Sequence, residues 1–435
     1  MKKMVIAICF AVALFAFPHA ARAQFLVVGC PGGFPLAPFP TINDALAAVT
    51  GPGAFILVSG TCSENVNLSG AINLSLAGSF GQPANINGNL SINNSQNVFL
   101  GGLNITNQFG DGIDVSSSRS VVLDSCTSNG NAGNGLTVGQ GSDVAIIATG
   151  AFSNNGAEGI SVGGNSIVNI SSFVGNTEIS NNQGSAVGID RSVFEAFGTH
   201  MAGNGQVAIN SLGAGKTLIF SFQGVNPTVI ENNAKGAVSL QEGSEISIGS
   251  VLPAAPNIIR NNGPFGVQAG FGSQVTLVGA LITGHTGPGV DVYAHSQFYG
   301  TSQLPGLGAT QIQTNGTAGD PLSAGVRVDG NSEVLLRGVN ISQNNGPAIL
   351  ALVNSSVDFA GNTFSSNTGV ITCDSTSSME SDLDASASNP ASGVRCGVAH
   401  SLGNRSLSTP APAVPNITNW KAIHKAYQQR SAAQK

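Results

Sequence analysis

Charged residues are scarce in this sequence of 435 residues, because Lys, Arg, Asp and Glu together make up only 9% of it. An average soluble domain has about 25%. The small charge is acidic, with a formal net value of −6, and no run of Lys or Arg forms a basic stripe. These features argue against nucleic acid and anionic membranes as partners. The low charge does not indicate disorder, because 41% of the residues are hydrophobic and can form a sizeable core.

Long hydrophobic runs are also missing, since the longest apolar stretch is residues 5–17. It is too short to span a membrane, so we do not expect an integral membrane protein. Lys2 and Lys3 precede it, and Ala21 and Ala23 follow it in an A-x-A pattern. This order is typical of a secretory signal peptide cleaved after Ala23. We therefore predict a secreted, periplasmic or cell-envelope protein that loses residues 1–23.

Cysteines are few, and five lie beyond the signal peptide. This number suits an exported protein with two disulfides and one spare thiol. Cys30 and Cys62 bracket the N-terminal region, and Cys373 and Cys396 bracket the C-terminal one, so we expect these two bridges. Cys126 stands in a β-like run and is expected to be a buried free thiol.

Aromatic residues are only 6% of the chain, whereas Gly is abundant, with 58 residues. Gly does not follow a period of three, which excludes collagen. It opens a motif of the form Gly-apolar-x-apolar that returns about every 23 residues over much of the chain. The copies begin at Gly112, Gly135, Gly159, Ala186, Gly236, Gly266, Gly289, Gly325 and Ala348.

Two further motifs alternate with the first. One is Ser-x-apolar-x-apolar, as in residues 142–146, and the other is an apolar residue ahead of an Asn pair, as in Ile230 before Asn232 and Asn233. Three short strands in each repeat predict a parallel β-solenoid with three sheets. Asn and Gly suit corners that need a positive φ. We expect the Asn pairs to be structural and to stack as a ladder.

These repeats resemble the right-handed parallel β-helix family, the pectin-lyase-like superfamily, in its repeat-rich form, over roughly residues 41–375. The resemblance implies an all-β chain folded as a single right-handed parallel β-helix. It does not imply one activity, because the superfamily includes lyases, hydrolases, esterases, adhesins and proteins without known chemistry.

The ends of the chain suggest caps. Residues 24–60 are expected to form an N-terminal cap with a helix at about 41–49, opened by the capping-box-like Thr41, and a first strand that begins at Phe55. Residues 61–375 hold the repeats, residues 376–407 a C-terminal loop with a disulfide, and residues 408–435 a Pro-rich linker and a short basic tail.

One stretch is similar to the first acidic motif of polygalacturonases, with Asp111 at the catalytic position. The other motifs of that family are altered. Asn134 stands where two aspartates are expected, Thr286 interrupts the Gly-His-Gly motif around His285, and Asp329 stands in place of a Lys. We therefore do not transfer that activity.

A different arrangement of carboxylates remains a candidate catalytic site. Asp111, Asn134 and Glu158 each precede the Gly of the first motif in three successive coils. Parallel strands lie about 4.8 Å apart, which places Asp111 and Glu158 roughly 9–10 Å from each other. An inverting glycosidase separates its two carboxyl groups by ~6.5–9.5 Å. The alternative is that these three are solvated corner residues. The adjacent coils favour this alternative, because they contain no Arg, His or aromatic residue that could bind a sugar or adjust the pKa of an acid.

Other candidates are weaker. The outward residues of the same sheet are small and mixed and resemble a plain wall. We expect His285 and His295 to be surface residues, without the spacing of a metal site, and we predict no metal or cofactor. An apparent insertion at residues 297–323 contains Tyr299, and Tyr293 lies just before it. Both are candidate binding residues, since such insertions often line a binding face.

The sequence thus favours an exported, non-catalytic scaffold that binds carbohydrate or another surface component, expected to be a monomer. It leaves open whether the protein is an enzyme. One alternative is a polysaccharide-degrading glycosidase that uses Asp111 and Glu158. The other is a structural envelope or adhesion protein.

Overall fold

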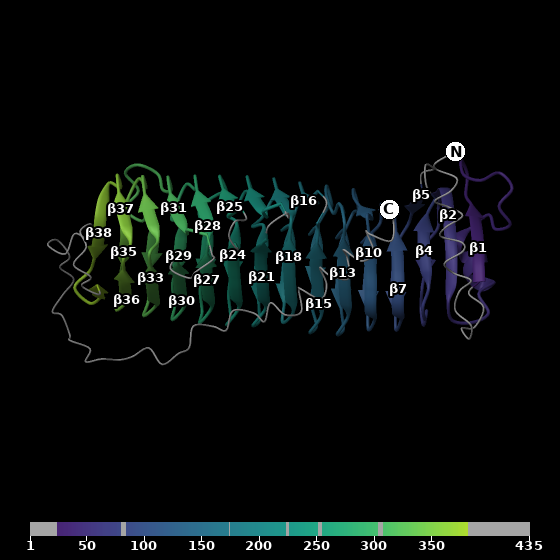
Figure 1. Ribbon diagram of the computed structural model, residues 1–435, viewed down its shortest axis with the longest axis horizontal. Coiled ribbons are helices and arrows are strands. Elements are labelled where there is room, and N and C mark those ends of the chain that lie inside the picture. Colours follow the sequence, from purple (N-terminus) through teal and green to yellow (C-terminus); the bar gives the residue numbers. More distant parts are fainter. Residues whose placement is uncertain are drawn as a thin grey trace. The chain divides into compact units, whose positions relative to one another are not determined.

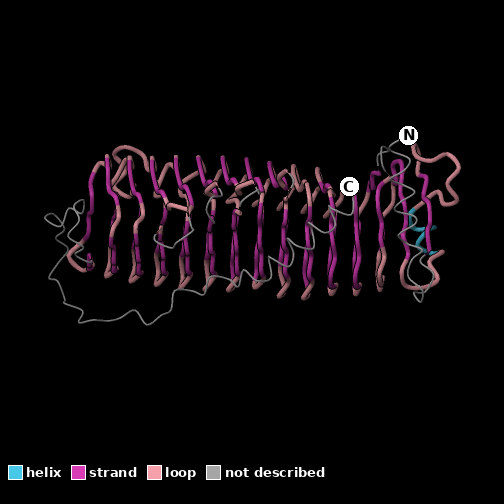
Figure 2. The backbone as a smooth tube through the Cα atoms, viewed as in Figure 1, coloured by secondary structure: helices cyan, strands magenta, loops and turns pink. Residues whose placement is uncertain are grey.

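Three parallel β-sheets make up almost all of the described part of the chain, which is residues 24–79, 84–173, 175–222, 226–250, 255–302 and 308–381 of the computed structural model. Most coils place one strand in each sheet, and strands from successive coils lie side by side in sequence order (Figures 1 and 2). In one coil, Ala151 alone bridges its neighbours in place of a strand. The predicted fold, a right-handed parallel β-helix, is confirmed.

Sheet C contains the strands of the Gly motif. They are β3 (Val66–Asn67), β6 (Leu90–Asn93), β9 (Ile113–Ser116), β12 (Leu136–Gly139), β14 (Ile160–Val162), β17 (Val187–Asp190) and β20 (Ile209–Leu212). The sheet continues with β23 (Val238–Leu240), β26 (Val267–Ala269), β29 (Val290–Val292), β32 (Val326–Val328), β35 (Pro347–Ala351) and β38 (Gly369–Cys373).

Sheet A contains the strands of the Ser motif. They are β1 (Gln24–Gly29), β2 (Ala54–Cys62), β4 (Ser75–Gly78), β7 (Gln96–Gly101), β10 (Arg119–Asp124), β13 (Asp143–Ile147), β15 (Ile167–Ser171) and β18 (Val193–Phe197). It continues with β21 (Lys216–Ser221), β24 (Glu245–Ser250), β27 (Gln274–Val278), β30 (Gln297–Thr301), β33 (Glu333–Arg337), β36 (Ser356–Ala360) and β39 (Ser378–Ser381).

Sheet B precedes the Asn corners. It contains β5 (Ala84–Asn87), β8 (Asn104–Thr106), β11 (Thr127–Ser128), β16 (Thr177–Ser180), β19 (Thr199–Ala202) and β22 (Val229–Glu231). It ends with β25 (Asn257–Arg260), β28 (Ala280–Thr283), β31 (Gln311–Gln313), β34 (Asn340–Ser342) and β37 (Thr363–Ser365). Strand β2 belongs to sheet A at its start and pairs with β5 at its end.

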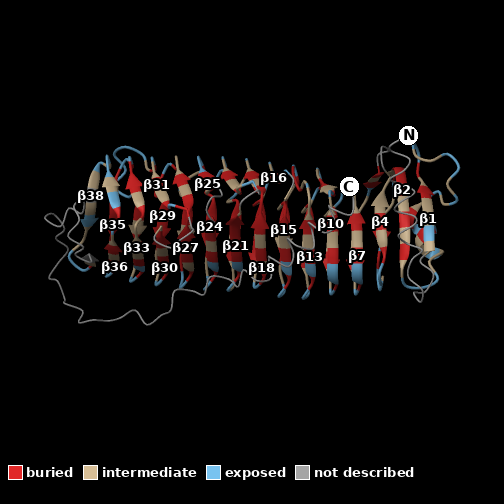
Figure 3. Cartoon of the chain, viewed as in Figure 1, coloured by how far each residue is buried: buried red, intermediate tan, exposed pale blue. Residues whose placement is uncertain are grey.

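The core lies inside the coils, because alternate side chains of each strand point inward. In β10, Val121 and Leu123 are fully buried, and they pair in register with Val144 and Ile146 of the next coil. Buried segments therefore recur from strand to strand (Figure 3). Each such side chain stabilises the fold by about 1.5–3 kcal/mol relative to an exposed one.

The corner between sheets B and C carries a ladder of buried Asn residues, as the sequence predicts. The residue before each ladder position after Asn107 has a positive φ, as Asn181 does before Asn182 and Asn232 does before Asn233. The main-chain N–H of one Asn donates to the side-chain oxygen of the Asn in the next coil, so every step joins two coils. The members are Asn107, Asn131, Asn155, Asn182, Asn204, Asn233 and Asn262, and then Asn315, Asn344 and Asn367.

The Ser motif has a similar basis. Ser95, Ser118, Ser142 and Ser166 are buried at the corner before sheet A. The main-chain N–H of each donates to the hydroxyl of the Ser in the following coil, at 3.0–3.2 Å. Polar residues at these corners thus satisfy main-chain groups that burial would otherwise leave unpaired.

The N-terminal end differs from the sequence prediction in one respect. The strand predicted from Phe55 is the second strand, because β1 precedes it and pairs with β2 over its whole length. The predicted helix is α2 (Ile42–Ala47), capped by the hydroxyl of Thr41. Glu64 completes this cap, since its carboxylate accepts the N–H groups of Ile42 and Asn43 at 2.7 and 3.0 Å.

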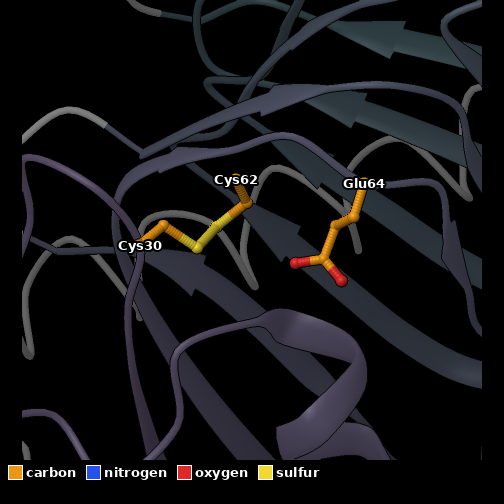
Figure 4. Close-up of side chains that lie close together, drawn as sticks. All are labelled: Cys30, Cys62 and Glu64. Atoms are coloured by element: carbon orange, nitrogen blue, oxygen red, sulfur yellow. A yellow bond between two sulfur atoms is a disulfide. The ribbon is translucent and has the colours of Figure 1, made fainter.

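The predicted bridge between Cys30 and Cys62 is present beside Glu64 (Figure 4). Within the described residues, these three side chains are the cluster that most resembles a metal site. The two sulfur atoms are bonded to each other, so the cluster does not supply thiolate ligands. Cys126 is free and buried, as predicted, and burial raises its pKa to about 12, which makes the thiol unreactive.

The repeats extend beyond the expected end at residue 375, because β39 adds a further strand to sheet A within the predicted C-terminal loop. The hydroxyl of Ser377 accepts the N–H of Ser355 and continues the Ser corners. Cys373 is disulfide-bonded. Its predicted partner Cys396 and the predicted linker and tail, residues 408–435, lie outside the described residues. The part of the chain that the structure describes contains no helix long and apolar enough to cross a membrane.

Candidate functional site

The outer face of sheet C brings the candidate residues into one row. The strand register places the outward residues of successive coils next to one another. In order they are Asp114, Thr137, Ser161, Gly188, Asn210, Ser239, Gln268, Asp291 and Arg327. Ionisable groups gather at both ends of this row, around Asp111 at one end and around Arg327 at the other.

At the first end, the predicted residues Asp111, Asn134 and Glu158 are linked by hydrogen bonds. The carboxylate of Asp111 accepts the main-chain N–H of Asn134 and the hydroxyl of Thr137, both at 2.7 Å. The side-chain oxygen of Asn134 in turn accepts the N–H of Glu158 at 2.9 Å. All three are half-buried, so they are not the freely solvated corner residues of the alternative interpretation.

Burial raises the pKa of Glu158, while a hydrogen bond from Ser161 lowers it and the negative charge of Asp111 raises it further. The side chain reaches the outer face because Gly188 leaves room for it. A Cβ at Gly188 would lie 2.1 Å from a Glu158 oxygen. A carboxyl group with a raised pKa next to a second carboxylate is the arrangement that a general acid requires.

Asp114 joins Asp111 and Glu158 in a carboxylate cluster, although the sequence pattern predicts only a plain wall at its position. Burial raises its pKa, the side-chain N–H of Asn89 opposes the shift, and Asp111 adds to it. Asn89 donates to the Asp114 carboxylate at 2.7 Å. Asp114 lies in the Gly motif three residues after Asp111, and this proximity in the sequence is the feature that could have identified it as a site residue.

At the other end of the row, the surface forms a groove of about 530 Å³. Its walls are apolar and polar side chains from sheet C and from the corners that lead into it. They are Pro264, Phe265, Gln268, Thr286, Gly287, Pro288, Asp291, Thr317, Asp320, Leu322 and Arg327. The expectation of a plain wall is wrong here.

An ion pair forms the floor of this groove. Arg327 donates from Nε and Nη2 to the two carboxylate oxygens of Asp291, at 2.7 and 2.8 Å, and Gln268 donates to the same carboxylate at 3.0 Å. The Asp291 side chain is only 3% exposed and that of Arg327 is 20% exposed. Such a two-pronged pair is rigid, so it presents its remaining polar atoms in a fixed geometry.

The two predicted tyrosines do not share a site. Tyr293 follows β29, and its ring packs edge-on against Phe271, with ring centres 5.6 Å apart. Burial raises the pKa of Tyr293, and the charge of Asp291 adds to this shift while that of Arg327 opposes it. Tyr299 lies instead in β30 of sheet A, between Thr276 and Leu335.

The supposed insertion at residues 297–323 is not a single loop. It contains β30 and β31, which are regular members of sheets A and B. This coil is longer than its neighbours partly because of the corner after β31, where Thr317, Asp320 and Leu322 line the groove.

His285 is not on the surface, contrary to the sequence prediction. Its side chain is buried, and the residue is 2% exposed. It occupies a position of the Asn ladder, since its N–H donates to Asn315 and Gly284 before it has the positive φ of that corner. Among the described residues, neither ring nitrogen makes a hydrogen bond of good geometry, although the main-chain carbonyls of Asn262 and Ile259 lie close to the ring. His295 is exposed, as predicted.

No protein-family model matches the chain, and no curated protein matches it in sequence. Among solved structures, the chain is similar to the A-modules of two Azotobacter vinelandii mannuronan C-5 epimerases. For AlgE4 the TM-score is 0.44 at 16% identity, over 78% of this chain and 94% of that one. For AlgE6 the TM-score is 0.40 at 18% identity, over 78% and 93%.

A family 28 exopolygalacturonase from Yersinia enterocolitica is also similar, with a TM-score of 0.30 at 13% identity over 85% of this chain and 80% of that one. Similarities at this level do not bear on activity or on the site.

Proposed function

We propose that the protein is exported and binds a glycan on the outer face of sheet C without cleaving it. The glycan would be a polysaccharide or belong to another cell-surface component. The groove around Arg327 carries this proposal. The signal-peptide pattern at residues 1–23 and the disulfide between Cys30 and Cys62 support export.

The groove has the two properties that sugar binding needs. Polar groups with fixed positions, such as the Asp291–Arg327 pair, can hydrogen-bond hydroxyl groups with little loss of side-chain entropy. Apolar side chains, such as Phe265 and Leu322, can cover the C–H face of a sugar ring. Leu322 is 47% exposed, so it offers apolar area that a ligand can bury. Pockets that combine apolar walls with a few convergent polar groups are the usual form of ligand sites.

Replacing Arg327 by Ala is expected to weaken glycan binding at least 10-fold, because it removes a floor donor and leaves the Asp291 carboxylate unpaired. A glycan array identifies a ligand, and titration calorimetry compares the variants. Arg337→Ala is the matched control, since Arg337 makes a similar two-pronged pair with Asp358 on sheet A, at 2.9 and 2.7 Å. Equal binding by wild type and the Arg327 variant would contradict a site at this groove.

The carboxylate cluster supports a second candidate function, a polysaccharide-degrading glycosidase in which Glu158 is the general acid and Asp111 the second carboxylate. The raised pKa of Glu158 beside Asp111 favours this candidate.

If cleavage occurs, Asp111→Asn and Glu158→Gln should each reduce turnover by about 10²–10⁴-fold, the usual contribution of a general acid or base. A reducing-sugar assay measures this loss. Both variants keep one oxygen that accepts hydrogen bonds. In Asp111→Asn this oxygen can keep the bond from the Asn134 N–H, and the Thr137 hydroxyl can turn to accept from the new amide. Melting temperatures should therefore stay close to that of the wild type. Cleavage that survives both substitutions would exclude these residues. If the wild type neither binds nor cleaves any glycan, a structural envelope or adhesion role would be favoured instead.

A further inference from the structure

We infer that the groove around Arg327 accepts neutral saccharides and discriminates against acidic ones. This inference rests on the proposed function, because it specifies the ligand class of the same groove. It follows from three features of the lining: its charge, the direction of its hydrogen bonds and its apolar walls.

The charge of the groove is the first feature. Arg327 is the cation that would bind a sugar carboxylate, but Asp291 already neutralises it through two hydrogen bonds. Asp320 adds an exposed carboxylate to the lining. This carboxylate is held in place, because its oxygens accept the N–H of Leu322 at 3.0 Å and the hydroxyl of Ser323 at 3.3 Å. With these three groups ionised, the groove carries a net negative charge, which repels a uronate.

The direction of the hydrogen bonds is the second feature. The hydroxyl of Thr286 donates its hydrogen to the carbonyl of Gly263 at 3.0 Å, and that of Thr317 donates to the carbonyl of Thr286 at 2.7 Å. Gln268 directs an amide hydrogen to Asp291. The two Thr hydroxyls therefore offer oxygen atoms that accept hydrogen bonds, as the amide oxygen of Gln268 and the Asp320 carboxylate do. A hydroxyl group of a neutral sugar can donate to them, whereas an ionised carboxylate has no hydrogen to donate.

The apolar part of the lining is the third feature. Pro264, Phe265, Pro288 and Leu322 contribute side chains to the groove. Water bound over such a surface is displaced favourably by the C–H groups of a sugar ring. A charged substituent on that ring would lose its hydration against the same surface, at a cost that the neutralised Arg327 does not offset.

The experiment compares two sets of probes on the full mature chain. The neutral set is xylohexaose, mannohexaose, cellohexaose and maltohexaose, and the acidic set is hexagalacturonate and hexamannuronate. We expect at least one neutral probe to bind at least 10-fold more tightly than both acidic ones in buffer of low ionic strength. The difference should shrink in 0.5 M salt, because screening weakens the repulsion by Asp320; the Debye length falls from about 10 Å at 0.1 M to about 3 Å at 1 M.

Asp320→Asn isolates the charge. Asn keeps an oxygen that accepts hydrogen bonds, so neutral probes should bind within about 3-fold of the wild type. The acidic probes should gain roughly 3–10-fold, which corresponds to the removal of one nearby charge in a partly solvated groove. Asp143→Asn is the control, since Asp143 is an exposed residue of sheet A with the same change of charge, and it should alter neither set.

The outcomes separate this inference from the proposed function. Acidic probes that bind as tightly as neutral ones, or that gain nothing from Asp320→Asn, would overturn the inference and leave glycan binding intact. Neutral binding that Arg327→Ala does not weaken would also overturn it, because the ligand would lie elsewhere on the protein. If neither set nor a wider glycan array binds, the proposed function fails and the inference fails with it.

Discussion

Replacing Asn204 by Ala is expected to lower the free energy of unfolding by about 3 kcal/mol or more. The side-chain oxygen of Asn204 accepts the main-chain N–H and the side-chain amide of Asn182, both at 3.0 Å. Its amide donates to the carbonyl of Ile179 at 3.1 Å and to the side chain of Asn233 at 2.8 Å. Asn204 is 1% exposed, so Ala would leave several buried polar groups without partners and without water.

Denaturant and thermal unfolding measure this cost. Asn104→Ala is the matched control, because Asn104 is an exposed Asn of sheet B that also bonds to neighbouring coils. Its amide donates to Asn85 at 3.1 Å, and its oxygen accepts the hydroxyl of Thr127 at 2.9 Å. Water can replace these partners, so the control should lose less than about 1 kcal/mol. If the two variants unfold alike, the buried ladder does not stabilise the coils as argued.

The sequence predicts the repeating parts of the fold well, because each repeat is a local pattern. The Gly, Ser and Asn motifs identify strands and corners, and their spacing gives the register that pairs Asp291 with Arg327. Strand β1 lies ahead of the repeat motifs, so they do not identify it, although its apolar residues 25–28 resemble residues 55–58 of β2. The strand forms through pairing with β2, a contact that no local pattern reveals.

The candidate sites could be predicted only in part, since they depend on side-chain direction. The sequence places Asp111 and Glu158 in corners two coils apart, but it does not reveal the half-burial that raises the pKa of Glu158. It places Gln268, Asp291 and Arg327 in three successive coils as well. Taken singly, these residues look like a mixed surface. Their hydrogen bonds to one another turn that surface into the floor of a groove.

His285 also shows that a motif can identify a position without revealing how its side chain is placed. The position belongs to the Asn ladder, but it holds a His in place of an Asn. Gly284 has the positive φ of the corner, and the N–H of His285 bonds to Asn315 as an Asn would. The imidazole does not accept the main-chain N–H of Asn262 as a side-chain amide oxygen does at other steps. The ring instead packs close to Gly266, where a Cβ would lie 2.9 Å from it. The Asn ladder is therefore interrupted at this coil.

Acid should destabilise the protein through His285. Burial lowers the pKa of His285 from 6.5 to about 4, and the carbonyl groups of Asn262 and Ile259 offset only part of this shift. Above pH 6.5 the ring is neutral in the folded and the unfolded chain. Between pH 6.5 and about 4 the unfolded chain binds a proton that the folded chain does not, so stability is lost as the pH falls. A shift of this size corresponds to a loss of roughly 3 kcal/mol at pH 4 and below.

The variant His285→Asn tests this loss directly. Asn restores the acceptor and donor of the ladder, which offsets its smaller volume at neutral pH, and it does not titrate. Raised pKa values at Asp114, Glu158 and Glu195 act in the opposite direction, since those groups bind protons more readily in the folded chain. The quantity to measure is therefore the difference in unfolding free energy between variant and wild type at each pH. It should grow in favour of the variant by roughly 3 kcal/mol from pH 7 to pH 4. A difference that stays constant over this range would show that His285 takes up its proton in the folded protein as easily as in the unfolded chain.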